Sequence, residues 1–302
     1  MSIDPVTDIT ITSGATEALF AAIQATVRAG DEVIVFDPSY DSFVPAIELA
    51  GGIAVRVPLH PHSFSVDWEQ FASALSQRTR LVIINSPHNP TGTMLSGNDL
   101  DRLAALIRDL DCFVLSDEVY EHITFDGRRH QTVIAHEELA ERSFAVSSFG
   151  KTFHATGWKV AYCVAPQALS VELRKIHQYL TFATSTPMQH AIAEYLPQAP
   201  SHCRELGDFF AQRRDYFAAG LAKTKFTVLP CHGTYFQLAD YSGVSELGDE
   251  EFCRWLTTDH GVAAIPISVF YETPPKDQRI VRFCFAKEYD TLDEAVSRLA
   301  QL

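Results

Sequence analysis

The stretch SSFGKT, residues 147–152, ends an apolar strand-like run and places a lysine directly after it. Lys151 is followed eight positions later by a second cation, Lys159. An amine at the end of a strand can form a Schiff base if its pKa is lowered, and nearby hydroxyls and a cation can hold a phosphate. A solvated surface lysine is the alternative explanation. The run therefore indicates a cofactor-binding lysine only if other segments supply matching groups.

A phosphate site is indicated by the segment ITITSGATEAL, residues 9–19. A short β-branched strand leads through Gly14 into a helix whose apolar residues share one face. The exposed amides at such a helix start attract phosphate, and a glycine lets the backbone approach closely. Ala15 and Thr16 present the first free N–H groups, and the Thr16 hydroxyl is a further donor. A plain turn capped by Ser13 is the alternative.

Polar side chains also follow two other apolar runs. Asn89 lies in an asparagine–proline turn, from which its amide can donate to a phenolate oxygen. Asp117 follows a four-residue apolar run, where a carboxylate needs a partner such as a protonated pyridine nitrogen. Tyr120, three residues later, can lie on the same side if a turn of helix follows. A structural turn and a capping aspartate are the alternatives.

The pattern of the first 150 residues predicts an α/β fold. Strand-like runs at residues 9–12, 33–36, 53–57, 81–84, 113–115 and 144–147 alternate with helical stretches around residues 15–29, 67–76 and 98–110. Such alternation predicts a mostly parallel sheet flanked by helices. Gly14, Asn89, Asp117 and Lys151 each follow the carboxyl end of a predicted strand, where ligands bind in open α/β sheets.

The remaining residues predict a smaller α+β domain. A helix is expected over about residues 201–223, strands over 226–229, 234–238 and 280–285, and helices near 250–260 and 292–302. We therefore expect a large cofactor-binding domain at residues 1–200 and a C-terminal small domain at 201–302, which includes the linking helix.

Together these segments resemble the fold-type I pyridoxal-phosphate enzymes, specifically the class I/II aminotransferases, and the resemblance extends from Ile9 to Leu302. It implies that Lys151 holds pyridoxal 5'-phosphate and that Asp117 pairs with the pyridine nitrogen. Tyr120 and Asn89 are implied as donors to the ring oxygen. The residues implied as phosphate ligands are Gly14, Ala15, Thr16, Ser148 and Lys159.

Two further residues are assigned by the resemblance. Tyr40 falls where the family stacks an aromatic ring on the pyridine face. Arg282 matches the arginine that binds the substrate α-carboxylate with a bidentate fork, and Asn89 is implied as a second substrate-binding residue. The implied catalytic residues are Lys151, Asp117 and Tyr120.

The activity implied by the resemblance is transfer of an amino group from an amino acid to a 2-oxo acid. Several segments are similar to bacterial methionine aminotransferases and to kynurenine and glutamine transaminases, which favour large apolar or aromatic amino acids. A carbon–sulfur lyase of the same fold, or a truncated cofactor-binding protein without turnover, remains open as an alternative. The family also implies a homodimer.

The start of the chain departs from the family pattern. Only eight residues precede Ile9, whereas family members begin well upstream with an arm, part of the small domain and a lead-in helix. We therefore expect an N-terminally truncated chain, either a fragment or a shortened relative, in which substrate contacts are lost.

Composition narrows the class of protein. A formal charge of −14 argues against nucleic-acid binding, and 46% hydrophobic residues in 302 positions are enough for two cores. Six scattered cysteines indicate free thiols in a reducing compartment. The chain shows no leader pattern and no apolar run near ~18 residues, so we expect a cytoplasmic protein rather than a membrane protein. His60 and His62 lie in a proline-flanked loop and have no further ligands at metal-binding spacing, so no metal site is expected. Arg128, Arg129 and His130 form the only compact basic cluster, which predicts an exposed turn after Gly127.

Overall fold

The computed structural model describes residues 2–302, and its larger part is built on a seven-stranded sheet. The strands are β1 (Ile9–Thr12), β2 (Glu32–Asp37), β3 (Ile53–Pro58), β4 (Thr79–Asn85), β5 (Phe113–Asp117), β6 (Ser143–Ser148) and β7 (Ala161–Val164), in the order β1-β7-β6-β5-β4-β2-β3. The five strands from β2 to β6 pair in parallel, while β7 is antiparallel to both of its neighbours, β1 and β6.

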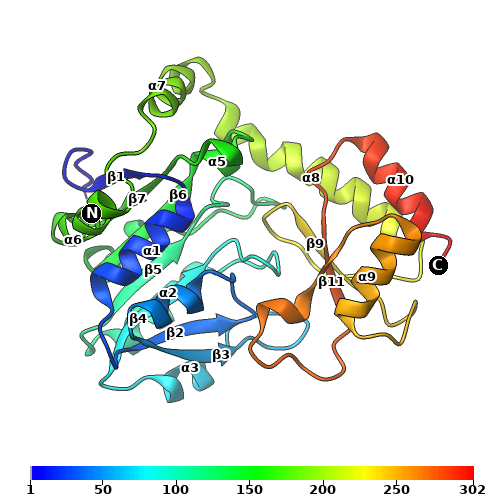
Figure 1. Cartoon of the computed structure of the whole chain (residues 1–302), viewed down its shortest axis with the longest axis horizontal. Helices are drawn as coiled ribbons and strands as arrows, with labels where there is room; N and C mark the ends of the chain where they lie inside the picture. Colours follow the sequence, from blue (N-terminus) through cyan, green and yellow to red (C-terminus); the bar gives the residue numbers. More distant parts are fainter. Residues whose placement is uncertain (1) are drawn as a thin grey trace.

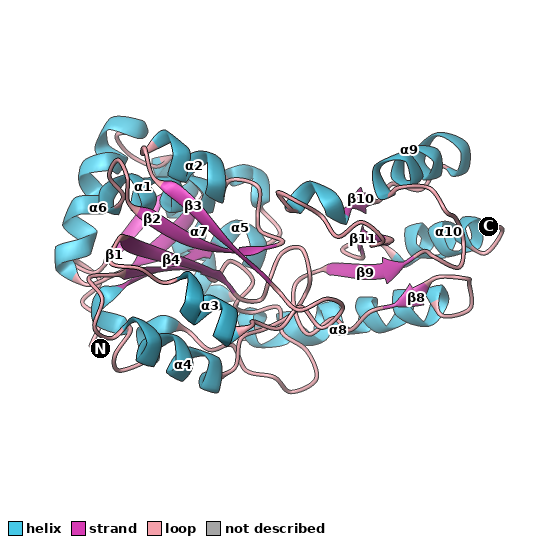
Figure 2. Cartoon of the chain, turned by 90° about the horizontal axis from the view of Figure 1, so that it is seen from below, coloured by secondary structure: helices cyan, strands magenta, loops and turns pink. Residues whose placement is uncertain are grey.

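Helices cover both faces of this sheet (Figure 2). On one face, α1 (Ala15–Thr26), α2 (Phe43–Leu49) and α6 (Gln167–Leu180) contribute to the core, and on the other face α3 (Trp68–Ala74) and α4 (Gly97–Ile107) do so. The larger part also contains α5 (Phe149–Thr152) and α7 (Thr186–Tyr195), and α7 projects away from the sheet (Figure 1). Alternate residues of β4 enter different cores: Leu81 and Ile83 pack in the core with α1, and Val82 and Ile84 pack in the core with α4. Burial on both faces explains why these strands are continuous apolar runs.

The smaller part carries a four-stranded antiparallel sheet in the order β10-β11-β9-β8. Its elements are α8 (His202–Leu221), β8 (Thr227–Val228), β9 (Phe236–Asp240), α9 (Asp249–His260), β10 (Ile265–Pro266), β11 (Ile280–Cys284) and α10 (Tyr289–Leu299). The long helix α8 leads from the large sheet into this part (Figure 1). Aromatic packing dominates the core, with the rings of Tyr241 and Phe252 stacked at 3.9 Å.

The predicted fold class is confirmed: a mostly parallel sheet flanked by helices is joined to a smaller antiparallel sheet with helices. The predicted helix at 15–29 ends earlier, at Thr26, because Val27 is extended. The sequence pattern did not predict α2, α6, α7 and the short strands β7 and β10. The boundary between residues 200 and 201 stays a prediction. Within residues 2–302, no helix is long and apolar enough to cross a membrane.

Candidate active site

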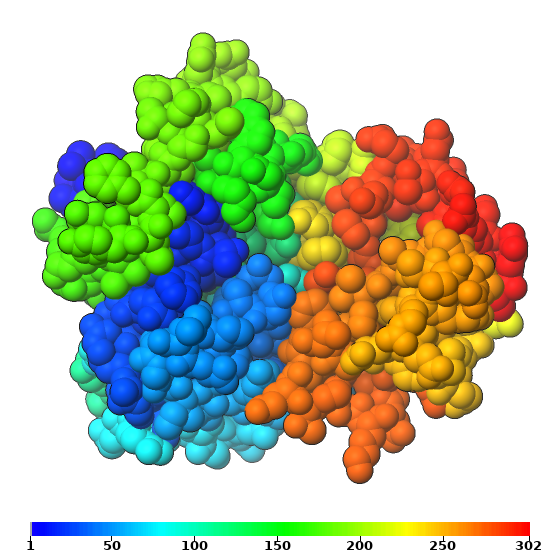
Figure 3. Space-filling model, in the orientation of Figure 1, coloured from blue at the N-terminus to red at the C-terminus, as the bar shows by residue number. Residues whose placement is uncertain are grey.

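A cavity of about 130 Å³ lies at the carboxyl ends of β5 and β6, beside the start of α1. Its walls include the ten residues predicted to contact a cofactor, namely Gly14, Ala15, Thr16, Tyr40, Asn89, Asp117, Tyr120, Ser148, Lys151 and Lys159. Leu19, Val119, Gly150, Thr156 and Val160 complete the lining. The molecular surface is hollowed where the larger part, blue to green, meets the smaller part, yellow to red (Figure 3).

The anion-binding end of the cavity is formed by the first turn of α1. Gly14 has φ +88°, a backbone conformation that favours glycine, and a Cβ on it would lie 2.9 Å from Cε of Lys159 and displace that side chain. No side chain caps the helix start. Lys159, itself left-handed with φ 54°, places its ammonium group beside the free amides. Helix amides and an adjacent cation fit a phosphate group.

Asp117 ends β5 and is 4% exposed. Burial raises the pKa of its carboxyl to about 7, against the lowering effects of the Val119 amide and of Lys151. The one hydrogen bond described for this carboxylate comes from the Val119 N–H at 3.2 Å. A buried carboxylate with so little compensation fits a cationic partner such as a protonated ring nitrogen.

Glu118, the next residue, shows a different arrangement. Its carboxylate accepts hydrogen bonds from the Ser116 hydroxyl at 2.9 Å and the Val133 N–H at 3.1 Å, and it pairs with His130 at 2.9 Å. The prediction that residues 128–130 form an exposed turn is thus wrong for His130, although Arg128 and Arg129 are exposed. The Glu118 carboxylate therefore has hydrogen-bond partners within the protein, whereas the Asp117 carboxylate remains able to pair with a ligand in the cavity.

Lys151 lies in α5 and donates from Nζ to the hydroxyl of Tyr235 at 2.7 Å. The Tyr235 ring meets Tyr120 edge-on at 5.3 Å, and burial raises the pKa of the Tyr120 phenol well above its ordinary value. A neutral phenol at this point can donate a hydrogen bond. Tyr235 was missed from the sequence because the residues around it show only ordinary strand-like alternation.

Two residues that were not predicted from the sequence, Asn85 and His88, stabilise the turn that contains Asn89. Asn85 accepts a hydrogen bond from the Asn89 N–H at 2.7 Å and donates to the Asp117 carbonyl at 2.8 Å. His88 pairs with Thr91 at 2.7 Å, and burial lowers its pKa to about 4, so its ring is neutral. These contacts fix Asn89 relative to Asp117.

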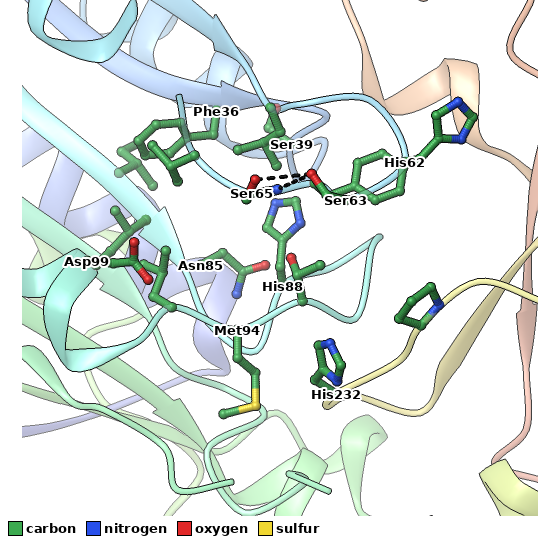
Figure 4. Close-up of a pocket in the computed structure, with 18 of the residues that line it drawn as sticks. Phe36, Ser39, His62, Ser63, Ser65, Asn85, His88, Met94, Asp99 and His232 are labelled. Atoms are coloured by element: carbon green, nitrogen blue, oxygen red, sulfur yellow. Dashed lines mark hydrogen bonds between the residues drawn. The ribbon is translucent and has the colours of Figure 1, made fainter. Parts of the chain in front are cut away.

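Asn85 and His88 also face a second, larger cavity of about 350 Å³ (Figure 4). Phe36, Met94 and His232 are among its other walls. Asn85 and His88 already have hydrogen-bond partners within the chain. Asn85 and His88, which line the larger cavity, therefore support the Asn89 turn at the edge of the smaller one.

Arg282 approaches the site from β11 of the smaller sheet. It donates a hydrogen bond to Oδ1 of Asn89, and its guanidinium lies over the rings of Phe236 at 4.0 Å and Phe270 at 4.8 Å. Its buried Nε has no hydrogen-bond partner within residues 2–302. Burial lowers the pKa of this guanidinium. A half-buried cation with an unused buried donor fits a carboxylate ligand.

Other sequence features lie outside the cavity. His60 and His62 are exposed, as expected for a loop. The described part of the chain brings no three His, Cys, Asp or Glu side chains together in a metal-binding arrangement. The six cysteines are free, and four of them are buried.

The fold and this group of residues define a class of enzyme. The chain belongs to the class I and II aminotransferases, whose family model, "Aminotransferase class I and II", matches residues 1–299. Among individual proteins, it is 56% identical over 299 residues to a methionine aminotransferase of Escherichia coli strain K12, with 99% of this chain and 77% of that protein covered.

Further comparisons agree with this assignment. The solved structure of YbdL from Escherichia coli, described as having a methionine aminotransferase function, matches with a TM-score of 0.97 at 56% identity over 100% of this chain and 80% of that chain. Human kynurenine–oxoglutarate transaminase 1 is 32% identical over 328 residues, which cover 98% of this chain and 78% of that protein. The predictions of an aminotransferase and of its family are thus confirmed.

Proposed function

We propose that this aminotransferase uses pyridoxal 5'-phosphate to move the amino group of methionine, or of another large apolar or aromatic amino acid, to a 2-oxo acid. One observation supports the choice of cofactor: a lysine amine, a buried carboxylate with few hydrogen bonds and an uncapped helix start surround one cavity. The preference for methionine rests on the 56% identity to the Escherichia coli enzyme.

The residues at the anion-binding end would hold the cofactor phosphate. The free amides of Ala15 and Thr16, the Ser148 hydroxyl and the Lys159 ammonium group are the proposed ligands. Tyr40 would cover one face of the ring. Tyr120 and Asn89 would donate hydrogen bonds to the ring oxygen, which keeps the ring in one orientation.

The chemistry divides between the cofactor and the chain. When bound, the cofactor supplies an electron sink for the substrate α-carbon. The Asp117 carboxylate would keep a proton on the ring nitrogen, and Nζ of Lys151, once free, would take the proton from the substrate α-carbon. Arg282 binds the substrate carboxylate and orients the α-hydrogen toward Lys151. Water then releases the 2-oxo acid, and a second 2-oxo acid accepts the amino group, so the kinetics are ping-pong.

Product analysis tests this proposal against the two alternatives. The purified protein is incubated with pyridoxal 5'-phosphate and methionine, with and without a 2-oxo acid, and the products are identified by mass spectrometry. An aminotransferase forms the 2-oxo acid of methionine together with the amino acid of the acceptor. Ammonia and a thiol formed without an acceptor would instead identify a lyase. Covalent cofactor without turnover of any amino acid would identify a binding protein.

We also propose a homodimer that works in the cytoplasm. Exposed aromatic side chains at the end of α6 and just beyond it support association, since Tyr179 is 84% and Phe182 80% exposed. The six free cysteines support a reducing compartment. Light scattering at micromolar concentration tests the dimer, which a monomer mass would contradict. Cell fractionation tests the location.

A further inference from the structure

We propose that Tyr235 is a positioning residue for Lys151, whose hydroxyl holds the ε-amino group whenever the amine is not attached to the cofactor. The inference rests on the proposed function, because it assumes that Lys151 alternates between a bound and a free state. It starts from one contact: Nζ of Lys151 donates to the Tyr235 hydroxyl at 2.7 Å. Lys151 belongs to α5 beside the large sheet, whereas Tyr235 immediately precedes β9 of the small sheet.

The backbone before Tyr235 is in an unusual conformation. Thr234 has φ +71° and is fully buried. A positive φ is costly for a β-branched residue and persists only where the surroundings enforce it. Two hydrogen bonds enforce it here: the Thr234 N–H donates to the Ile123 carbonyl at 3.0 Å, and the Thr234 hydroxyl accepts from the Phe236 N–H at 3.2 Å. The turn therefore fixes the direction in which the next side chain leaves the backbone.

Aromatic contacts restrict the Tyr235 ring in the same direction. The ring meets Tyr120 edge-on at 5.3 Å and lies against Phe210 at 5.8 Å. The Lys151 ammonium lies 5.3 Å from the Tyr235 ring centroid and 5.4 Å from that of Tyr120. Tyr235 is half-buried and is not among the residues that line the cavity, while the Lys151 amine that its hydroxyl contacts belongs to a lining residue.

The residue after Tyr235 contacts the other cation of the site. Phe236 lies under the guanidinium of Arg282 at 4.0 Å. Two consecutive residues thus support the amine that moves the proton and the guanidinium that binds the carboxylate. Through these two contacts, residues 234–236 fix the position of the Lys151 amine relative to the Arg282 guanidinium. That relative position decides whether the α-hydrogen of a substrate bound to Arg282 points at Nζ.

The test uses Tyr235→Phe, which removes the hydroxyl and keeps the ring. In the cofactor-free protein, lysines are labelled with a limiting amount of acetic anhydride, and the modification of Lys151 is compared with that of the exposed Lys223 by peptide mass spectrometry. Losing one ordinary hydrogen bond should raise the relative labelling of Lys151 by about three- to tenfold. Unchanged labelling would overturn the proposal.

A second measurement separates positioning from a structural role. In the cofactor-loaded protein, we expect the single-turnover rate with methionine to fall by about tenfold, because proton transfer depends on the placement of the amine. The cofactor dissociation constant should stay within about twofold of the wild-type value, because Tyr235 is not among the residues that line the cavity. A wild-type single-turnover rate in Tyr235→Phe would also overturn the proposal.

Tyr241→Phe is the matched control. Tyr241 is a buried tyrosine of the same small domain, and its hydroxyl donates to the Leu247 carbonyl at 2.8 Å, away from the site. This variant should leave both Lys151 labelling and the single-turnover rate unchanged. If the wild-type protein does not turn over any amino acid, the proposed function fails, while the labelling of Lys151 still decides whether Tyr235 holds the amine.

Discussion

The two sides of the site are built differently. On the side of the large sheet, Gly14, Asp117 and Lys151 follow strand ends, and the local backbone fixes each of them. On the side of the small sheet, Arg282 lies in β11 and Tyr235 immediately precedes the neighbouring strand β9, and both are held by aromatic rings from other parts of the chain. We infer that the large-sheet side governs cofactor chemistry and that the small-sheet side governs substrate placement.

The strongest test of this division is Lys151→Ala. Without the amine no covalent bond to the cofactor can form, so we expect complete loss of borohydride-trapped cofactor and of turnover. Mass spectrometry of the reduced protein measures the bond. Lys159→Ala is the control, since it should weaken cofactor binding and still allow trapping at high cofactor concentration. Trapped cofactor at full level in Lys151→Ala would remove this lysine from its role.

Asp117→Asn should have the next largest effect. An uncharged amide cannot keep the ring nitrogen protonated, so the single-turnover rate should fall by about 10²- to 10³-fold, while some cofactor still binds. Stopped-flow spectroscopy measures the rate. Asp249→Asn is the control, because Asp249 is a buried aspartate of the small domain that accepts hydrogen bonds from Ser268. A near-normal rate in Asp117→Asn would mean that this carboxylate only supports its turn.

Arg282→Lys tests the small-sheet side. It keeps the charge and loses the planar fork, so kcat/KM for methionine should fall by about 10- to 100-fold, with cofactor affinity nearly unchanged. Arg279→Lys is the control on the same side, because Arg279 pairs with Glu246 at the surface. An equal loss of cofactor affinity in Arg282→Lys would contradict the proposed division between the two sides.

For the cofactor-free protein we expect a change in stability with pH rather than a change in activity. In the cofactor-free protein, burial raises the pKa of Asp117 to about 7, above the value near ~3.9 of an unfolded chain. Between these values the folded state holds a proton that the unfolded state has lost, so the folded protein loses stability as pH rises through this window. An asparagine at position 117 cannot ionise, so the Asp117→Asn variant does not lose stability as pH rises through this window.

We therefore expect Asp117→Asn to be more stable than the cofactor-free wild type at pH 8, by about 4 kcal/mol, with little difference at pH 4. Urea titration at the two pH values measures the difference. Asp249→Asn should show the opposite sign at pH 8, because its carboxylate accepts two hydrogen bonds. A lower stability of Asp117→Asn at pH 8 would show that the carboxylate is compensated in the folded protein.

The large-sheet side could be predicted from the sequence because its information is local. A glycine before a helix, or a carboxylate after an apolar run, marks a strand end without knowledge of what packs against it. The same reasoning found the six strands up to β6 and the helices α1, α3 and α4 between them, but missed α2. It did not find β7, whose four residues are antiparallel to both neighbours and so depart from the alternating pattern.

The contacts between distant segments could not be predicted in this way. Tyr235 reaches Lys151 across 84 positions, and Arg282 reaches Asn89 across 193. His130 looked like part of an exposed basic turn, yet it pairs with the buried Glu118. Arg282 itself was found only through the family resemblance, since an arginine in a β-strand carries no local mark of its ligand.

The uncapped first turn of α1 should affect how fast the protein is degraded in the cell. A phosphate bound there would act as the missing cap, and a ligand that binds only the folded state stabilises it by about 2.7 kcal/mol at 100 times its dissociation constant. Vitamin B6 supply should therefore control the abundance of this enzyme as well as its saturation. Cultures starved of the vitamin should degrade it faster at equal messenger level, which a pulse-chase experiment can measure.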